Sequence, residues 1–400
     1  MAKVTGITPA AGVTLQATPT TQPGGGSPVP FRKATTRKIE IGLQDQRVVT
    51  ALPQPISGVV EGTGYLESID LEVVAVSAGN AAAVAYPGGA ATDSPWSALQ
   101  DIAFRAVGPD LFTLSGYDLY LLNLYGGFGQ LTARGPAIFV TGDPMNYLAV
   151  IGAGATGGSI RYTLRLPCAI NPRSLLGIMG NQSQGTKYQL STTLAPNTAI
   201  WSVQPTNAPT FTITKYYNYA SVPAPVDSLN RPQAQVPPAY GVLHMVNSLR
   251  SEAAVLSGTG VQHYLRQLGN TTRLLILVFR LASGLRSDLP LFTLATQTDA
   301  RITMRIGDDV IISETAAHRR NIMWNRYHFD APTGVLVYDW ISDFVDRPGY
   351  ELGDDWLNLA NIPNAQFEIA YPAFAGGPAS LQIISDMLVI PPTVDVQSFV

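Results

Sequence analysis

Charge and cysteine are both scarce in this sequence. Only 13% of its 400 residues are Asp, Glu, Lys or Arg, about half the share usual in soluble domains, so neutral polar groups must cover most of the surface. The formal net charge of −3 excludes a generally basic nucleic-acid binder. The one cysteine, Cys168, excludes an intrachain disulfide and a cysteine-rich zinc cluster. The four histidines never stand at the i, i+4 spacing of a helical zinc site.

Long apolar runs are missing as well. The most apolar stretch, Leu274 to Phe279, ends at Arg280 and is far shorter than the roughly 18 apolar residues that a membrane-spanning helix needs. It therefore predicts a buried strand. Residues 1–13 contain Lys3 but no apolar block of signal-peptide length. We expect a soluble chain made in the cytoplasm.

Proline and glycine mark two irregular segments. Residues 1–31 hold five prolines and a run of three glycines, with Lys3 as the only charge. Such a segment cannot build its own core, so we expect an extended arm that is ordered only by neighbouring subunits or by a surface beneath it. Five further prolines between residues 222 and 239 indicate a linker between two halves of similar size. The predicted organisation is an arm (1–36), a first domain (37–222), a linker (223–239), a second domain (240–392) and a tail (393–400).

Alternation of apolar and polar residues predicts strands in both halves. Between residues 160 and 166, Ile, Tyr and Leu alternate with Arg161, Thr163 and Arg165, the pattern of a strand with one buried face. Similar short segments, separated by Gly, Pro and Asn turns, favour antiparallel β-sandwiches over a parallel α/β sheet.

Only a few short helices are expected. A capping box at Ser115–Asp118 begins one that covers residues 119–125. Residues 354–359 have a similar short pattern, and we expect the His318-Arg319-Arg320 cluster to lie at the C-terminus of a helix, facing its dipole.

An internal repeat links the two halves. In each half, a strand that ends in arginine is followed by a glycine-aspartate turn, a returning strand and a serine that caps a helix. The two copies are Ile102–Arg105, Gly108, Asp110 and Ser115, and Ile302–Arg305, Gly307, Asp309 and Ser313. Arg105 and Arg305 stand 200 positions apart. We therefore expect two tandem copies of one β-sandwich, with these two arginines at equivalent positions.

The glycine run 152–158 has the GxGxxG spacing of dinucleotide-binding sites. That site needs a helix after the glycines and an acidic residue about 20 positions further on. Here residues 159–166 alternate as a strand, and no Asp or Glu occurs from Pro144 through Val226. We expect a turn that binds no cofactor.

No catalytic signature appears elsewhere, neither a GxSxG elbow nor a GxxxxGK[ST] loop. Asp339, Asp343 and Asp346 lie near Trp340 and Trp356 in the sequence, which leaves open a carboxylate pair that cleaves glycosides. Solvated carboxylates in loops and at strand ends are the other interpretation. We expect no enzyme activity, no cofactor and no metal.

A basic run stands between the arm and the first strand. It consists of Arg32, Lys33, Arg37 and Lys38, and these four are the candidate site residues. Four charges give a modest, salt-sensitive attraction to lipid headgroups or nucleic-acid phosphates, but no means of reading a sequence. A solvated strand entry is the other interpretation.

Several strings, in this order, resemble the major capsid proteins of tectivirus-like bacteriophages, which are double jelly-roll proteins of membrane-containing phages. The resemblance covers most of residues 37–392 and is carried by residues 62–73 (GTGYLESIDLEV), 77–81, 95–102, 114–127 (LSGYDLYLLNLYGG), 334–343, 355–361 and 366–371. The chain departs from this family at its N-terminus, where relatives often begin with a polar helical segment.

The resemblance implies an all-β chain of two tandem eight-stranded jelly rolls with a few short helices. It implies pseudo-hexagonal homotrimeric capsomers in an icosahedral shell around an internal membrane vesicle and double-stranded DNA. Partners are then neighbouring capsomers, penton or vertex proteins, minor capsid proteins and the membrane, with no sequence-specific nucleic acid. The location implied is the virion capsid, assembled in the host bacterial cytoplasm, with the basic run facing the particle interior.

Two alternatives stay open. A trimeric jelly-roll vertex or receptor-binding protein is also rich in Gly and Thr, although tandem duplication with a short linker fits a shell tile better. A carbohydrate-active β-sandwich enzyme needs paired carboxylates in a cleft.

Overall fold

The computed structural model of the chain describes residues 27–60, 64–76, 92–106, 110–128, 147–150, 159–170, 175–182, 188–201, 207–238, 240–251, 258–265, 270–289, 299–341, 356–359, 362, 364–371 and 378–389. Several sequence-based predictions fall outside these residues. They concern arm residues 1–26, Gly108, the glycine run 152–158, Asp343, Asp346, residues 354–355 and the tail 393–400.

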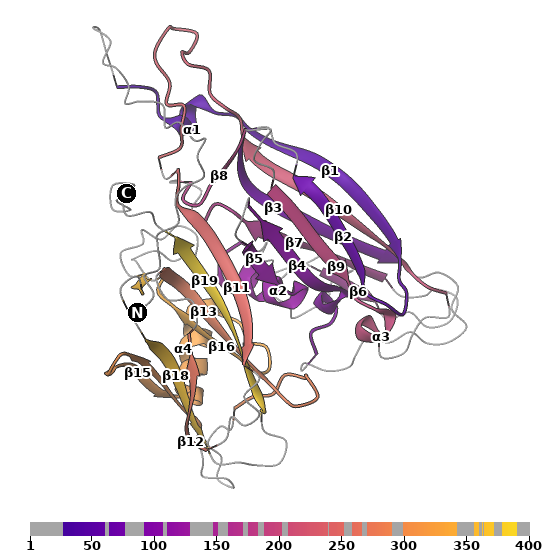
Figure 1. Cartoon of the computed structure of the whole chain (residues 1–400), viewed down its shortest axis with the longest axis vertical. Coiled ribbons are helices and arrows are strands. Elements are labelled where there is room, and N and C mark those ends of the chain that lie inside the picture. Colours follow the sequence, from indigo (N-terminus) through magenta and orange to yellow (C-terminus); the bar gives the residue numbers. More distant parts are fainter. Residues whose placement is uncertain are drawn as a thin grey trace, which may run out of the picture.

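The first half of the chain forms two antiparallel sheets that pack face to face (Figure 1). The neighbour order in one sheet is β1 (Arg37–Val48), β10 (Thr210–Ala220), β3 (Gly64–Val76), β7 (Ser159–Pro167) and β6 (Tyr147–Val150), with β8 (Met179–Asn181) also paired to β3. The order in the other is β2 (Gln54–Val60), β9 (Tyr188–Leu194), β4 (Leu99–Arg105) and β5 (Asp110–Leu114). Four short helices accompany them: α1 (Phe31–Ala34), η1 (Trp96–Ala98), α2 (Gly116–Tyr125) and α3 (Asn197–Ile200).

The second half repeats this arrangement. One sheet has the order β11 (Leu243–Ser251), β19 (Ser380–Val389), β13 (Thr271–Arg280) and β16 (Val335–Asp339), with β17 (Leu357–Asn358) also paired to β13. The other has the order β12 (Gly258–Tyr264), β18 (Ala365–Tyr371), β14 (Arg301–Ile306) and β15 (Asp309–Thr315), followed by helix α4 (Ala316–Tyr327). Strand by strand, β1, β10, β3 and β7 correspond to β11, β19, β13 and β16, and β2, β9, β4 and β5 correspond to β12, β18, β14 and β15. The all-β prediction of two tandem eight-stranded jelly rolls is confirmed.

The predicted repeat is visible in the strand register. A β-bulge falls between Phe104 and Arg105 in the first roll and between Met304 and Arg305 in the second. Arg105 and Arg305 therefore hold equivalent positions, as predicted. The bulge leaves one residue of the returning strand without a partner, Leu111 in β5 and Ile311 in β15.

The helix caps agree with the prediction in the first roll and differ in the second. The Ser115 hydroxyl accepts from the Asp118 N–H at 3.1 Å and the Asp118 carboxylate accepts from the Ser115 N–H at 3.0 Å, so the predicted capping box begins α2. In the second roll Ser313 lies within β15, and the Thr315 hydroxyl caps α4 by accepting from His318 N–H. The prediction of a Ser313 cap is therefore wrong, because β15 continues through two more ladder residues before the chain turns into the helix.

Two further local predictions are wrong. The His318-Arg319-Arg320 cluster lies within the first five residues of α4 and not at its C-terminus. Leu357 and Asn358 form the short strand β17 rather than a helical piece, because they pair with Thr272 and Thr271 at the start of β13. Within the described residues, no helix is long and apolar enough to cross a membrane.

The burial of each strand explains its pattern of apolar residues. The inward residues of β3, such as Ile69, Leu71 and Val73, are fully buried between the sheets of the first roll. β13 is buried along both faces, because one face packs in the second roll and the other meets the first roll. The unbroken apolar run in the sequence predicted this buried strand. Cys168, directly after β7, is buried and free, and burial raises the pKa of its thiol well above the usual range.

A strand pair joins the two rolls. β5 pairs in parallel with β11, so that Phe112 is opposite Val246 and Thr113 is opposite Asn247. One sheet of the first roll therefore continues into a sheet of the second. Helix α2 lies at this junction (Figure 1), and all ten of its residues are buried.

Buried charged side chains form hydrogen bonds between the two rolls at the same junction. Asp386 on β19 accepts from Nε2 of His244 on β11 and from Nη1 of Arg273 on β13, at 2.7 Å each. His244 Nδ1 donates to the Pro167 carbonyl at 2.7 Å, and Arg273 Nη2 to the Gly126 carbonyl at 2.8 Å. Because an ionised carboxylate and a carbonyl can only accept, both ring nitrogens of His244 donate, which is the geometry of the imidazolium form. We call His244, Arg273 and Asp386, which are fully buried, the junction triad.

Candidate functional site

The basic run lies where the arm meets the first roll. Arg32 and Lys33 are on α1, and Arg37 and Lys38 begin β1. Phe31 anchors α1, because its ring is buried and meets Tyr65 edge-on, with 5.1 Å between the ring centroids. Leu175, Ile178 and Ala220 complete this small apolar cluster. Lys33, Arg37 and Lys38 remain exposed around it.

The end of the arm is ordered by the proline-rich segment of the same chain. Val29 N–H donates to the Pro232 carbonyl at 2.9 Å, and Ala234 N–H donates to the Val29 carbonyl at 3.0 Å. The Tyr65 hydroxyl bonds to the Gln235 carbonyl at 2.8 Å and ties this segment to β3. For residues 27–31, the expectation that only neighbouring subunits or a surface would order the arm is therefore wrong. Backbone pairing between distant segments is invisible to a count of prolines and glycines.

The four basic side chains differ in their partners. Arg37 forms a bidentate ion pair with Glu67 of β3, with Nη2 to Oε2 at 2.9 Å and Nε to Oε1 at 3.1 Å. Lys33 and Lys38 form no ion pair with any described residue. The charge of Arg37 is thus partly compensated, whereas both lysines present theirs to solvent.

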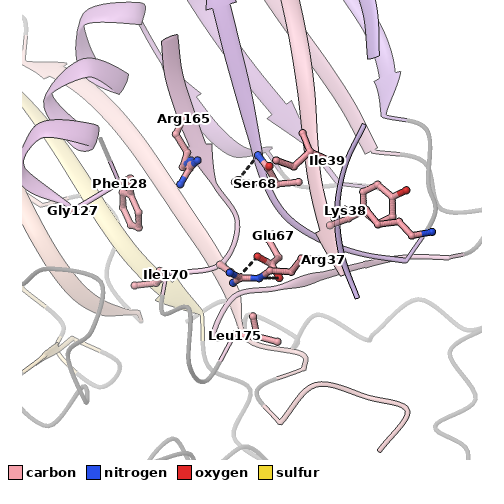
Figure 2. A pocket seen from close by; sticks show the side chains of 13 residues that line it. Arg37, Lys38, Ile39, Glu67, Ser68, Gly127, Phe128, Arg165, Ile170 and Leu175 are labelled. Carbon is pink, nitrogen blue, oxygen red and sulfur yellow. Dashed lines mark hydrogen bonds and ion pairs between the residues drawn. The ribbon is translucent and has the colours of Figure 1, made fainter. Parts of the chain in front are cut away.

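A recess of about 440 Å³ opens beside Arg37 and Lys38 (Figure 2). Its lining combines three cationic side chains, one carboxylate and several neutral groups: Arg37, Lys38, Arg165, Glu67, Ile39, Ser68, Gly127, Phe128, Ala169, Ile170, Leu175, Asn218 and Tyr219. Arg32 and Lys33 are not part of this lining. The structure therefore brings two of the four predicted site residues into the recess and leaves two on α1 next to it.

Side-chain hydrogen bonds link three strands at the recess. Arg165 of β7 binds the Asp70 carboxylate of β3 through Nε at 2.8 Å and Nη2 at 3.1 Å. Asn218 of β10 donates to Asp70 at 3.0 Å and to Ser68 at 3.1 Å. The alternation in β7 placed Arg165 on the outward face. Nothing local in the sequence indicated its partners, which stand on strands far away along the chain.

The groups that line the recess are mostly cationic and neutral. Its one lining carboxylate, Glu67, is already paired, and no thiol or imidazole lines it. Within the described residues, no group of three or more His, Cys, Asp and Glu could hold a metal ion. The Lys38 ammonium, beside neutral donors of the lining, suits a phosphate or another anion at a surface.

The carboxylate neighbourhood near the tryptophans is structural where it is described. Asp339 accepts from Arg326 Nε at 3.0 Å and from the Tyr327 hydroxyl, and the Asp339 side chain is buried. Burial, with the nearby Asp339 charge, holds the pKa of Tyr327 well above its usual range. Both contacts are made to Oδ2, so the arginine and the tyrosine hold the Asp339 carboxylate in place.

Comparison with solved structures identifies the fold. The chain is similar to the major capsid protein of Sulfolobus turreted icosahedral virus, with a TM-score of 0.60 and 15% sequence identity over 89% of this chain and 97% of that one. It is also similar to the capsid protein of the virus PBCV-1, with a TM-score of 0.58 and 15% identity over 88% of this chain and 94% of that one. The resemblance to double jelly-roll major capsid proteins is thus confirmed at the level of the fold. No protein-family model and no curated protein sequence matches the chain.

Proposed function

We propose that this chain is a structural major capsid protein that builds an icosahedral virus shell. The observation that carries the proposal is the double jelly roll itself, two rolls with one strand order, which aligns with solved viral capsid proteins over 88–89% of the chain. The low share of charged residues, 13%, supports it, because charged residues are depleted in the buried cores of interfaces.

The building unit in this proposal is a homotrimer. Three chains with two similar rolls each present six similar walls and tile as a pseudo-hexagonal capsomer. Each chain consists of the arm (1–36), the first roll (37–222), the linker (223–239), the second roll (240–392) and the tail (393–400). Its partners are neighbouring capsomers, penton or vertex proteins and minor capsid proteins. The particle is a tectivirus-like phage assembled in the bacterial cytoplasm.

The basic run faces an internal membrane in this proposal. Each basic residue near an anionic lipid surface contributes about 1 kcal/mol, an attraction that falls off within a Debye length. Lys33 and Lys38 supply most of it, since Glu67 already compensates Arg37. The recess next to Lys38 is large enough for a headgroup phosphate, at about 440 Å³. Such contacts position a capsomer on a vesicle without anchoring it irreversibly.

We expect the purified protein to be a trimer at micromolar concentration. Obligate interfaces bury above roughly 2,000 Å². Native mass spectrometry should therefore give three times 42.7 kDa. Electron microscopy of particles will then show six-walled tiles. A monodisperse monomer with no tendency to assemble would contradict the proposed function.

We expect the variant with Arg32, Lys33, Arg37 and Lys38 all changed to Gln to lose salt-sensitive binding to anionic liposomes. Four contacts of about 1 kcal/mol correspond to at most about a thousandfold weaker binding at low salt. The Lys33→Gln/Lys38→Gln variant should account for most of this loss. Liposome flotation at increasing salt measures both.

The control is Arg105→Gln/Arg301→Gln, which removes two exposed charges from strands away from the basic run. It should leave liposome binding within about twofold, as expected for a charge that does not approach the surface. Equal loss in control and test variants, or no loss in either, would refute the membrane role and leave the capsid role standing.

A further inference from the structure

The proline-rich segment between the two rolls forms a small hairpin. Val226 and Pro232 form an antiparallel bridge, and the Gln233 N–H donates to the Pro225 carbonyl at 3.0 Å. The end of the arm pairs with the second side of this hairpin. The hairpin projects beyond α1 at the top of Figure 1. We call residues 226–232 the linker hairpin.

One carboxylate organises the turn of the linker hairpin. Asp227 Oδ1 accepts from the N–H groups of Leu229 at 2.9 Å and of Arg231 at 2.8 Å, and its Oδ2 pairs with Nε and Nη2 of Arg231 at 2.7 Å each. The Asn230 N–H donates to the Asp227 carbonyl at 3.0 Å, and Asn230 has the left-handed φ of +58° that asparagine tolerates in turns. The turn is thus preformed, and its two charges neutralise each other.

This turn presents an apolar side chain to solvent. Leu229 is 70% exposed and Val226 is 45% exposed. The neighbouring prolines have no N–H, and the N–H groups of Leu229, Asn230 and Arg231 are bonded within the turn. Unsatisfied backbone groups are the main obstacle to entering a bilayer. The linker hairpin can therefore bring Leu229 out of water without leaving these donors unpaired.

A cationic side chain lies at the same end of the molecule. α1 begins directly after the arm residues that pair with the linker hairpin. Its Lys33 is exposed and forms no ion pair with a described residue. An apolar tip beside a free ammonium matches an anionic bilayer, which offers phosphates to the cation and an acyl region to the leucine. A single exposed leucine on a convex turn is too small for a stable protein interface, which buries about 800 Å² per partner.

We propose that the linker hairpin is a lipid-inserting contact, in which Leu229 enters the interfacial region of an anionic bilayer while Lys33 binds headgroup phosphates. This inference rests on the proposed function, in which the basic run faces an internal membrane. It adds to the electrostatic attraction an apolar contact that salt does not screen. The linker between the rolls is then itself a membrane-docking element.

Fluorescence of a labelled tip tests the insertion. Cys168 is the one cysteine of the sequence and is buried, so Leu229→Cys supplies an accessible thiol for the environment-sensitive dye NBD. Vesicles of phosphatidylglycerol and phosphatidylcholine should raise and blue-shift the emission of the dye, and lipids with a nitroxide near the headgroup should quench it. The matched control is Leu52→Cys, which labels a side chain of similar exposure, 72%, beyond the far end of β1. The control label should show neither change.

Vesicle flotation measures the contribution of the leucine to binding. Leu229→Asp should weaken binding about tenfold or more, as expected for the loss of one buried leucine, and the loss should persist at high salt. Lys33→Gln/Lys38→Gln should weaken binding at low salt only. Leu229→Phe keeps an apolar tip and should retain binding, and Leu52→Asp should bind like the wild type. Circular dichroism and native mass spectrometry check that each variant keeps the fold and the oligomeric state of the wild type.

Three results would overturn this inference and leave the capsid role standing. They are a label at position 229 that does not respond while the protein binds vesicles, a Leu229→Asp variant that binds vesicles like the wild type, and a Leu229→Asp variant that fails to assemble but still binds vesicles, because the tip would then contact protein. A wild type that binds no anionic vesicle would contradict this inference and the membrane role of the basic run. A wild type that inserts its tip but never assembles would contradict the proposed capsid function alone.

Discussion

An Asp386→Ala variant is expected to lose about 3–5 kcal/mol of unfolding free energy, because it leaves buried cationic partners uncompensated. In the wild type the Asp386 carboxylate neutralises Arg273 and His244 at 2.7 Å each. Neither cation can reach water, since both are fully buried between the rolls. Denaturant unfolding of the purified protein, with the midpoint and slope fitted together, measures the loss.

The control for this prediction is Asp110→Ala, which breaks an ion pair of similar length with Arg105, 2.6 Å, but at an exposed position. Exposed pairs are worth about 0–1 kcal/mol. In a double-mutant cycle, Arg273→Met combined with Asp386→Ala should cost less than the sum of the two single changes by about 0.5–3 kcal/mol, because the double variant has no unpaired guanidinium. A loss below about 1 kcal/mol for Asp386→Ala would show that the triad does not hold the rolls together.

The Asp386 carboxylate also determines how the stability of the protein falls at low pH. Burial alone raises the pKa of Asp386, but the positive charges of His244 and Arg273, with their hydrogen bonds, outweigh it and hold the pKa below its usual range. A depressed carboxyl pKa contributes stability that is present above the unfolded pKa and is lost as pH falls through the folded one. Below about pH 4, the usual value for Asp, the wild type should therefore lose stability more steeply than Asp386→Ala.

A Gly177→Ala variant is expected to be destabilised by about 2–5 kcal/mol, the sum of a left-handed backbone cost and an overpacking cost. Gly177 has φ +86°, and a Cβ there would lie 2.3 Å from the Cys168 carbonyl oxygen and 3.1 Å from His244 Cβ. The neighbour that would have to move is backbone at the end of β7, directly beside the junction triad. Thermal and denaturant unfolding measure the effect.

Gly284→Ala is the matched control for Gly177→Ala. Gly284 has the same φ of +86°, but a Cβ there would meet no heavy atom within 4 Å. It should therefore cost only the backbone term, about 1–2 kcal/mol. Equal losses in the two variants would mean that the close contact at Gly177 relaxes without cost.

Part of the fold could be predicted because its causes are local. The capping box of α2 needs only Ser115 and Asp118, three positions apart. The buried strand β13 follows from an unbroken apolar run, and the equivalence of Arg105 and Arg305 from a repeated string. The prediction of the cap of α4 failed because two nearby residues could each cap the helix. Ser313 and Thr315 both carry a hydroxyl suited to a helix cap, and the length of the β15 ladder decided between them.

The candidate site, too, was predicted only in part. The basic run was evident because its charges are adjacent in the chain, and two of its members line the recess. Glu67 and Asn218 were missed, since they come from strands that reach Arg37 and Ser68 only after the sheet has formed. The pairing of Val29 with the segment around Pro232 was missed for the same reason, because backbone hydrogen bonds leave no trace in side-chain composition.

The sequence by itself determined the strand alternation, the duplication, the first helix cap and the position of the basic run, since each depends on residues within a few positions of one another or on a repeated string. Only the tertiary structure decided which surfaces are covered and which charges are buried. Leu124 and Trp324 occupy equivalent places on two helices, yet Leu124 is buried and Trp324 faces solvent. Asp386 meets His244 and Arg273 across 142 and 113 positions of chain. Such contacts form when strands far apart in the chain pair in one sheet, and no short-range pattern encodes them.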